Sequence, residues 1–177
     1  FLKKFCSFRE KRNYLHSTDI FNQIIYFIKN RDIKDLEINF KKKIKNYPYL
    51  IILNDSNLKI KKTYCINFNY KKDNIKYYGF IYQSLSKIIN KKKYDEQKFQ
   101  QTIQLTKKSI LIPTNVDYDF IEKITSGTMK YLNNNNSINL KGKWYLVKLK
   151  IRNISQINNR DFIKVTSTKC NENVNFF

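Results

Sequence analysis

Lysine side chains recur along this chain in short runs and at alternate positions, and the chemistry they could perform is phosphate binding. An ammonium group binds phosphate as a point charge and carries no base-sequence information. The clusters fall in predicted turns and on the polar faces of predicted strands, so we expect them to contact RNA. The candidate RNA-binding residues are Lys41, Lys42, Lys43, Lys59, Lys61, Lys71, Lys72, Lys107, Lys108, Lys141, Lys143, Lys148, Lys150 and Arg152.

The charge balance points to a polyanionic partner. The chain has 35 Lys and Arg against 14 Asp and Glu, a formal net charge of +21. Such a chain repels itself unless a polyanion offsets the charge, and the two common polyanions are nucleic acid and an anionic membrane surface. The alternative is a lysine-coated surface that arose by codon drift and has no partner.

Codon drift is plain in the composition. The chain contains no Ala, only three Gly and two Pro, and Lys greatly outnumbers Arg. Alanine is the best helix former, so no folding constraint explains its absence. Ala, Gly, Pro and Arg use GC-rich codons, and the coding DNA is therefore extremely AT-rich. An organelle, a reduced bacterium, a virus or a protist is the expected source.

Residues typical of catalysis are sparse. Three scattered glycines cannot build a phosphate-binding loop, and His16 is the only histidine, best explained as a surface or helix-capping residue. Cys6, Cys65 and Cys170 are widely spaced, which suggests neither disulfides nor a zinc site and fits a reducing compartment.

A two-metal nuclease needs clustered carboxylates. The nearest group, Asp117, Asp119 and Glu122, opens a predicted helix, where acids simply complement the helix dipole. We therefore expect no enzymatic activity, no cofactor, no bound metal and no small-molecule substrate.

The first third of the chain shows clear periodicity. Residues 1–16 are predicted to be a basic arm without regular structure. Ser17 and Thr18 would cap a helix that extends to Ile28, with Asp19 in its first turn. Residues 36–40 alternate as a half-buried strand, 41–45 form a basic bend, and 49–53 form a short buried strand.

The middle of the chain predicts further elements. Residues 58–70 alternate as a strand, and a turn over 71–74 follows. Apolar residues over 78–89 then follow helical spacing, with Lys91 to Lys93 at the end of that helix. Residues 99–105 and 110–112 are predicted to be two strands or a hairpin.

The last third contains one more helix. It would be capped by Thr114 or Asn115 after Pro113 and would bury Val116, Phe120, Ile121, Ile124, Tyr131 and Leu132. An asparagine loop, a strand over 143–151 that points Val147 inward, and a last strand over 162–165 complete the chain. No stretch approaches the roughly 20 apolar residues that span a bilayer, and no signal-peptide hydrophobic region follows the start.

Over residues 58–152 the predicted order is strand, helix, strand, strand, helix, strand. This order is that of the α+β ferredoxin-like sandwich, the split βαβ (βαββαβ) fold. We expect an N-terminal α/β extension over 1–57, the RNA-binding core over 58–152, and a C-terminal strand and tail over 153–177.

Aromatic side chains could stack on RNA bases and so add to the phosphate contacts of the lysines. The candidates are Tyr47, Tyr49, Tyr77, Tyr78 and Trp144. The alternative is that they fill the core in place of the missing small residues, which we favour for Tyr78.

One segment carries a family resemblance. Leu105, Thr106 and Lys107, followed by Pro113, Asn115 and Val116 and then by Glu122 in a helix, resemble the signature of the tenth protein family of the small ribosomal subunit. Thr106 stands where the family has proline, Asn115 where it has histidine, and Ile112 where it has serine. The predicted element order is similar to the family's fold, and the composition is similar to that of proteins encoded in ciliate mitochondrial genomes.

The resemblance implies a structural constituent of a mitochondrial ribosome, located in the matrix. The region of Lys107 and Lys108 would reach into the head of the small subunit and contact ribosomal RNA, and neighbouring ribosomal proteins would pack on the sheet. Two alternatives remain at this point. One is a peripheral, non-catalytic subunit of a respiratory complex that rests on anionic lipid. The other is an enzyme, such as a small nuclease or a thioesterase-like sandwich.

Overall fold

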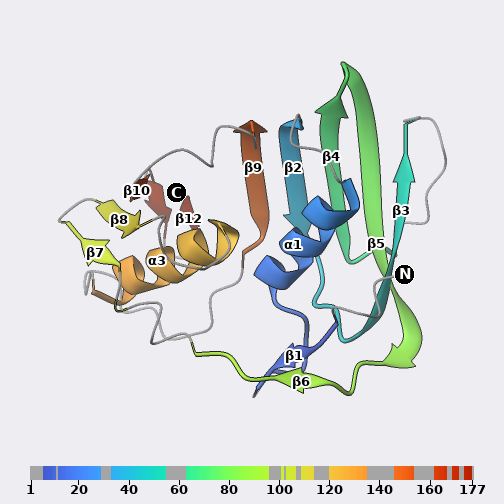
Figure 1. Cartoon of the computed structure of the whole chain (residues 1–177), viewed down its shortest axis with the longest axis horizontal. Helices are drawn as coiled ribbons and strands as arrows, with labels where there is room; N and C mark the ends of the chain where they lie inside the picture. Colours follow the sequence, from blue (N-terminus) through green and yellow to red (C-terminus); the bar gives the residue numbers. More distant parts are fainter. Residues whose placement is uncertain are drawn as a thin grey trace. The chain divides into compact units, whose positions relative to one another are not determined.

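The computed structural model is an α+β protein, which confirms the expected class (Figure 1). It describes residues 6–10, 12–28, 33–54, 63–95, 101, 103–106, 109–113, 120–134, 146–153, 162–166, 169–171 and 174–176. The chain forms two compact units, one made of residues 1–94 and 146–157 and the other of 95–145 and 158–177. This division differs from the predicted boundaries at 57 and 152.

The first unit contains a five-stranded sheet in the order β3-β5-β4-β2-β9, with every pairing antiparallel (Figure 1). Two of its strands come from the segment predicted to be an extension, so that segment belongs to the sheet. The strands are β2 (Lys34–Phe40), β3 (Asn46–Leu53), β4 (Ile66–Lys72), β5 (Ile75–Lys87) and β9 (Lys148–Asn153).

Helix α1 (Ser17–Ile28), which the periodicity predicted, lies over one face of this sheet (Figure 1). Its residues Ile20 and Ile24 are buried, and so are Ile38 and Phe68 on the sheet, so the two apolar faces form the core of this unit. The cap lies one residue earlier than expected. The carbonyl of His16 accepts the first helical hydrogen bond, from Ile20 N, which leaves Ser17 in the first turn.

The N-terminal segment is not a free basic arm as far as it is described. Strand β1 (Phe8–Arg9) pairs in parallel with β6 (Lys91–Lys92). Cys6, Phe8 and Leu15 are buried, and Leu15 N donates to the carbonyl of Ile44. The prediction was wrong because three apolar residues at irregular spacing can be buried by contacts that no local period reveals.

The largest error concerns residues 78–89, which do not form an amphipathic helix; residues 78–87 belong to strand β5, and 88–89 follow it. The apolar residues of this segment fit both the helical and the strand period, and pairing with the neighbouring strands makes it a strand. Asp73 and Asn74 have φ values of 52° and 61°, the backbone that a tight two-residue hairpin turn requires. This turn places β5 directly against β4, and β3 pairs with the other edge of β5.

Strand β3 lies where the sequence predicted it but is not buried. It is an edge strand, and Tyr49, Ile51 and Ile52 are at least 37% exposed. Pro48 sits beside a register shift near its start, which suits an edge position because proline cannot donate to a ladder.

The second unit contains a three-stranded sheet in the order β10-β8-β7 and helix α3. Its elements are β7 (Gln104–Leu105), β8 (Ser109–Pro113), α3 (Phe120–Asn134) and β10 (Phe162–Thr166), with a small hairpin of β11 (Lys169–Asn171) and β12 (Val174–Phe176). The expected hairpin, helix and last strand are thus confirmed. Gly127 lets the helix approach β8 closely, because a Cβ there would lie 2.8 Å from Ile112 Cδ1.

Since residues 75–87 form a strand, the ferredoxin-like order is not confirmed. In β9, which starts at Lys148, Ile151 is buried as expected, but Val147 before it is 60% exposed and does not point inward. Several predictions fall outside the described residues, namely the first part of the strand over 58–70, Phe99, the helix cap at Thr114 or Asn115, Val116, the end of the asparagine loop and residues 143–145. Among the described residues, no helix is long and apolar enough to cross a membrane.

Candidate nucleic-acid interface

The five-stranded sheet has two faces of opposite character. Along each strand alternate residues point to opposite sides, and the α1 side is apolar and buried. The other side, which we call the open face, carries charged, amide, aromatic and aliphatic side chains that are half-buried or exposed, apart from the buried Tyr82. In register, the open face consists of Glu37, Asn39, Tyr49, Ile51, Leu53, Asn67, Asn69, Lys71, Lys76, Tyr78, Phe80, Tyr82, Lys148 and Lys150.

Two complete rows cross the open face from one sheet edge to the other. The first row runs Lys148, Asn39, Asn67, Phe80, Ile51, and the second runs Lys150, Glu37, Asn69, Tyr78, Leu53. Each row begins with a cation at β9, passes through polar side chains on β2 and β4, and ends with an aromatic and an aliphatic residue on β5 and β3. The open face therefore changes in steps from basic to aromatic.

The basic edge is partly neutralised by one carboxylate. Lys148 Nζ lies 2.8 Å from Glu37 Oε1, and Lys150 Nζ lies 3.3 Å from Glu37 Oε2. The hydrogen bond from Lys148 is the main reason that the pKa of Glu37 is held below its ordinary value. Both lysines keep about half or more of their side-chain surface exposed, so the edge retains positive charge toward solvent.

A second ion pair lies further along the sheet. Lys71 Nζ is 2.9 Å from Asp35 Oδ2, and its hydrogen bond lowers the pKa of that exposed carboxyl. Asp35 has a φ of 52° beside the register shift of β2. The turn-like backbone at this bulge places the carboxylate next to Lys71.

Aromatic rings gather at the β3 and β5 end of the open face. The rings of Tyr49 and Tyr82 are stacked, with centroids 5.2 Å apart and planes 11° apart. Tyr64 meets Phe80 at 5.2 Å and Tyr82 at 6.3 Å, both edge to face. These are favourable arrangements for aromatic quadrupoles, so the cluster is ordered before any ligand binds.

Cations sit directly against this cluster. Lys41 Nζ donates to Tyr64 Oη at 2.7 Å and lies 4.3 Å from the ring centroid. Lys76 Nζ lies 5.2 Å from the centroid of Tyr78. Basic and aromatic side chains are thus interleaved, as in surfaces that hold phosphates and bases together.

The structure brings some of the predicted RNA-binding residues together. Lys71, Lys148 and Lys150 share the open face, and Arg152, exposed and two residues after Lys150 on β9, extends its basic edge. The other described candidates are the exposed Lys41, Lys42 and Lys43, which lie in the connection between β2 and β3, and the half-buried Lys72, which lies at the end of β4. Lys59, Lys61, Lys107, Lys108, Lys141 and Lys143 lie outside the described residues.

The predicted stacking residues divide between the two faces. Tyr49 is 48% exposed on the open face. Tyr78, expected in the core, is half-buried on the open face, whereas Tyr77 stacks on Tyr70 on the α1 side with centroids 5.1 Å apart. Trp144 is outside the described residues.

Sequence reasoning named Tyr49 and Tyr78 as possible stacking residues, but it did not single out Lys76, Phe80 and Tyr82. Lys76, Tyr78, Phe80 and Tyr82 occupy every second position, which is a strand signal that the helical spacing of their neighbours obscured. Asn67 and Asn69 were expected on the polar face of the strand over 58–70, but neither they nor Asn39 gave a signal of function, because asparagine is abundant throughout the chain.

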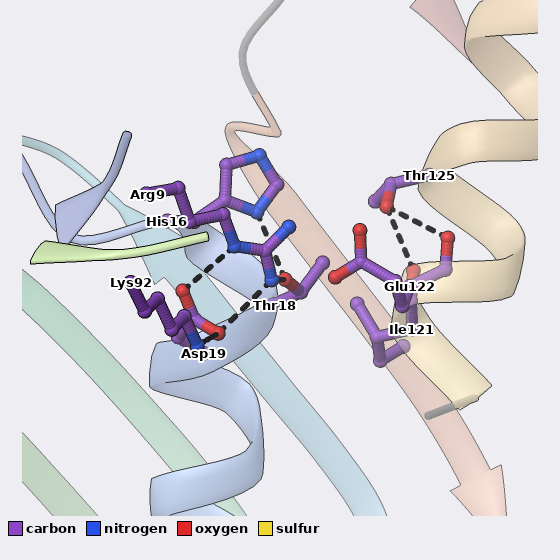
Figure 2. A network of polar contacts seen from close by, with 8 residues as sticks. All are labelled: Arg9, His16, Thr18, Asp19, Lys92, Ile121, Glu122 and Thr125. Carbon is purple, nitrogen blue, oxygen red and sulfur yellow. Dashed lines mark hydrogen bonds and ion pairs between the residues drawn. The ribbon is translucent and has the colours of Figure 1, made fainter. Parts of the chain in front are cut away.

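A second polar cluster joins the N-terminal segment to α1 and β6 (Figure 2). The guanidinium of Arg9 donates to both carboxylate oxygens of Asp19, at 2.9 and 3.0 Å, and to Thr18 Oγ1 at 2.7 Å. Lys92 Nζ lies 2.8 Å from Asp19 Oδ1. Burial would raise the pKa of Asp19, but the hydrogen bonds and charges of Arg9 and Lys92 outweigh it and lower that pKa.

This cluster is structural in character. Arg9 is 5% exposed, and its guanidinium carbon lies 3.9 Å from the centroid of the Tyr94 ring. His16 Nδ1 lies 2.8 Å from Thr18 Oγ1, so the single histidine supports the start of α1. Arg9 was not singled out from the sequence, since one arginine in a basic segment resembles a solvated charge.

The described acid of the predicted carboxylate group lies on α3. Glu122 is 5% exposed in the first turn of that helix. Its carbonyl and that of Ile121 both accept hydrogen bonds from Thr125 Oγ1 (Figure 2). Asp117 and Asp119 lie outside the described residues. Across the described part of the chain, no three His, Cys, Asp or Glu side chains are grouped as metal ligands would be.

The fold and the open face define an α+β protein with a basic and aromatic sheet surface. Comparison with protein-family models, with curated proteins and with solved structures found no match to this chain.

Proposed function

We propose that this chain is an RNA-binding structural constituent of an organellar ribosome, in the small subunit of a mitochondrial ribosome. The observation that carries the proposal is the combination of a +21 net charge with an ordered basic and aromatic face. Ribosomal RNA supplies both the phosphates and the bases that such a face can hold.

The distribution of lysines supports a partner that surrounds the protein. Exposed lysines of the first unit occur on the open face, in the β2–β3 connection at Lys41 to Lys43, and on and beside β6 at Lys91 to Lys93. A flat lipid surface would favour one basic plane. Folded RNA can approach from several directions, so this spread favours RNA.

The family resemblance agrees with one local feature. Strands β7 and β8 pair as an antiparallel hairpin, and Lys107 and Lys108 lie between them in the sequence. The resemblance to the tenth small-subunit family expects a hairpin with basic residues in this segment. This agreement supports the family assignment as part of the proposal.

Sedimentation of the native protein tests the proposal. Gently lysed organelles are run on sucrose gradients with and without ribonuclease, and the protein is followed by immunoblot. We expect migration with the small ribosomal subunit that is lost after ribonuclease. Migration in a detergent-sensitive, ribonuclease-resistant complex would overturn the proposal and favour a peripheral respiratory subunit.

Binding in vitro separates the same two partners. The purified chain is mixed with vesicles of 30% anionic lipid or with total ribosomal RNA, at matched phosphate concentration. The proposal expects salt-sensitive binding to RNA with little sequence preference, because affinity falls as salt competes for the phosphates. Stronger binding to the vesicles than to RNA would contradict it.

A further inference from the structure

We propose that the open face binds single-stranded RNA, with unpaired bases stacked at its aromatic end and the phosphates held at its basic edge. The inference rests on the proposed RNA-binding role and names the surface and the form of RNA that it takes. Lysines alone do not distinguish paired from unpaired RNA, since both present phosphates. The aromatic end of the face makes the distinction.

The stacking platform begins at Tyr49. One side of its ring lies on Tyr82, at 5.2 Å and nearly parallel, and the residue is 48% exposed. A ring that is supported from behind and open in front loses little entropy when a base stacks on it. Base stacking requires a free base face, which unpaired nucleotides offer and the interior of a duplex does not.

The support behind the platform is rigid. Tyr82 is only 7% exposed, and Tyr64 packs edge-on against both Tyr82 and Phe80. Lys41 is held at Tyr64 by a hydrogen bond and by its position over the ring. A phosphate beside the stacked base would therefore meet a cation already in place.

The centre of the face offers hydrogen bonds to base edges. Asn39, Asn67 and Asn69 lie side by side on β2 and β4, and each amide carries donors and an acceptor. Within the described part of the chain, Oδ1 of Asn67 is buried without a hydrogen-bond partner. An unpaired buried acceptor is unfavourable, and a ligand donor reached by rotation of the amide would remove that cost.

The basic edge completes the site on the side away from the aromatic cluster. Lys148 and Lys150 on β9 each begin one of the two residue rows that cross the open face, and both contact Glu37, the acid in those rows. Five strands at about 4.8 Å spacing span roughly 19 Å from β9 to β3. A four-stranded sheet is enough to stack two or three bases in a common RNA-binding module, so this face has room for a short single strand.

Fluorescence anisotropy with labelled oligonucleotides tests the inference. The probes are an unstructured 12-nucleotide RNA and a 12-base-pair RNA stem made of two strands, without a loop. The variants of the full chain are Tyr49→Leu, which removes the ring but keeps the apolar contact, and Tyr49→Phe, which keeps the ring. Tyr26→Leu is the matched control, because Tyr26 is 56% exposed but lies on α1 and not on the open face.

We expect Tyr49→Leu to weaken binding of the single strand by about 5- to 20-fold, and Tyr49→Phe and Tyr26→Leu to change it less than about 2-fold. The stem should bind more weakly than the single strand and should be insensitive to Tyr49. Equal effects of Tyr49→Leu and Tyr26→Leu, or equal affinity for the two probes, would overturn the inference while leaving RNA binding intact. A wild-type chain that binds neither probe would overturn the proposed function as well.

Discussion

The ring of Phe68 on β4 lies directly over the backbone of Gly79 on β5. The two residues are register partners, and a Cβ atom on Gly79 would stand 2.0 Å from Phe68 Cζ. The buried ring therefore packs against the bare backbone of Gly79, on the face of the sheet that α1 covers. Phe68 is 1% exposed, so it has little room to move aside.

Gly79→Ala is expected to destabilise the first unit by about 1–3 kcal/mol, because overpacking a full core forces side chains and backbone to shift. Urea denaturation followed by tyrosine fluorescence and circular dichroism measures the change. Gly79→Ala should cost less stability when it is added to Phe68→Leu than when it is made in the wild-type chain, since the methyl group then meets no ring.

Gly127→Ala is the matched control for this prediction. The atoms nearest to its methyl group would be the Cδ1 atoms of Ile112 and Ile110, which are side-chain ends, and alanine gains about 1 kcal/mol of helix propensity over glycine. The control should therefore change stability less than Gly79→Ala does. A Gly79→Ala protein as stable as wild type would contradict the close approach of Phe68.

Arg9→Met is expected to destabilise the chain by about 2–4 kcal/mol, because it leaves the nearly buried carboxylate of Asp19 without its bidentate partner. Lys92 still contacts Asp19, which keeps the loss at the lower end of that range. Arg9→Lys should recover only part of the stability, since lysine cannot form both hydrogen bonds. Arg12→Met, which removes an arginine from the same segment, should cost clearly less; equal losses would contradict the role of Arg9.

Acidic pH should remove the contribution of the Asp19 carboxylate to the folding stability of the chain. Its pKa in the folded chain is below the ordinary value of 3.8, so its stabilising effect is complete above that value and is lost as the pH falls through 3.8 toward the folded pKa. The stability difference between wild type and Asp19→Asn should be constant near neutral pH and shrink below about pH 4. Urea midpoints between pH 2.5 and 7 measure it, and a difference that does not change with pH would refute the prediction.

Local patterns predicted some elements of this fold well. Helix α1 buries Ile20 and Ile24 at helical spacing, and β4 buries Ile66 and Phe68 at alternate positions. Each of these segments has one apolar side and one clear period. Their structure could be deduced because burial on a single face leaves its pattern in the sequence.

The failures occur where two periods or distant contacts compete. Residues 78–89 contain both a helical stripe and the alternation of Tyr78, Phe80 and Tyr82, and pairing with strands on both edges selects the second. Arg9 binds Asp19, ten residues away on α1, and also contacts the ring of Tyr94. The dispersed lysines were visible in the sequence, but the open face was not, since it depends on the register of five strands.

The carboxylate of Glu37 offers a charge test of the open face. It engages both Lys148 and Lys150 and so reduces the charge available to a phosphate. If RNA binds there, Glu37→Gln should tighten binding of a single-stranded RNA about 2- to 5-fold, because it removes repulsion and frees two ammonium groups. Glu10→Gln makes the same change in net charge on the segment at β1 and should have a smaller effect.

The double variant Lys148→Gln with Lys150→Gln should act in the opposite direction. It should weaken binding and reduce the slope of log affinity against log salt by about 1.4, since each phosphate contact on a single strand contributes about 0.7. Anisotropy titrations between 50 and 300 mM salt would measure both effects. If Glu37→Gln weakened binding, or if the double variant left the salt slope unchanged, these two lysines would not be phosphate contacts, and RNA would have to be held by other lysines of the chain.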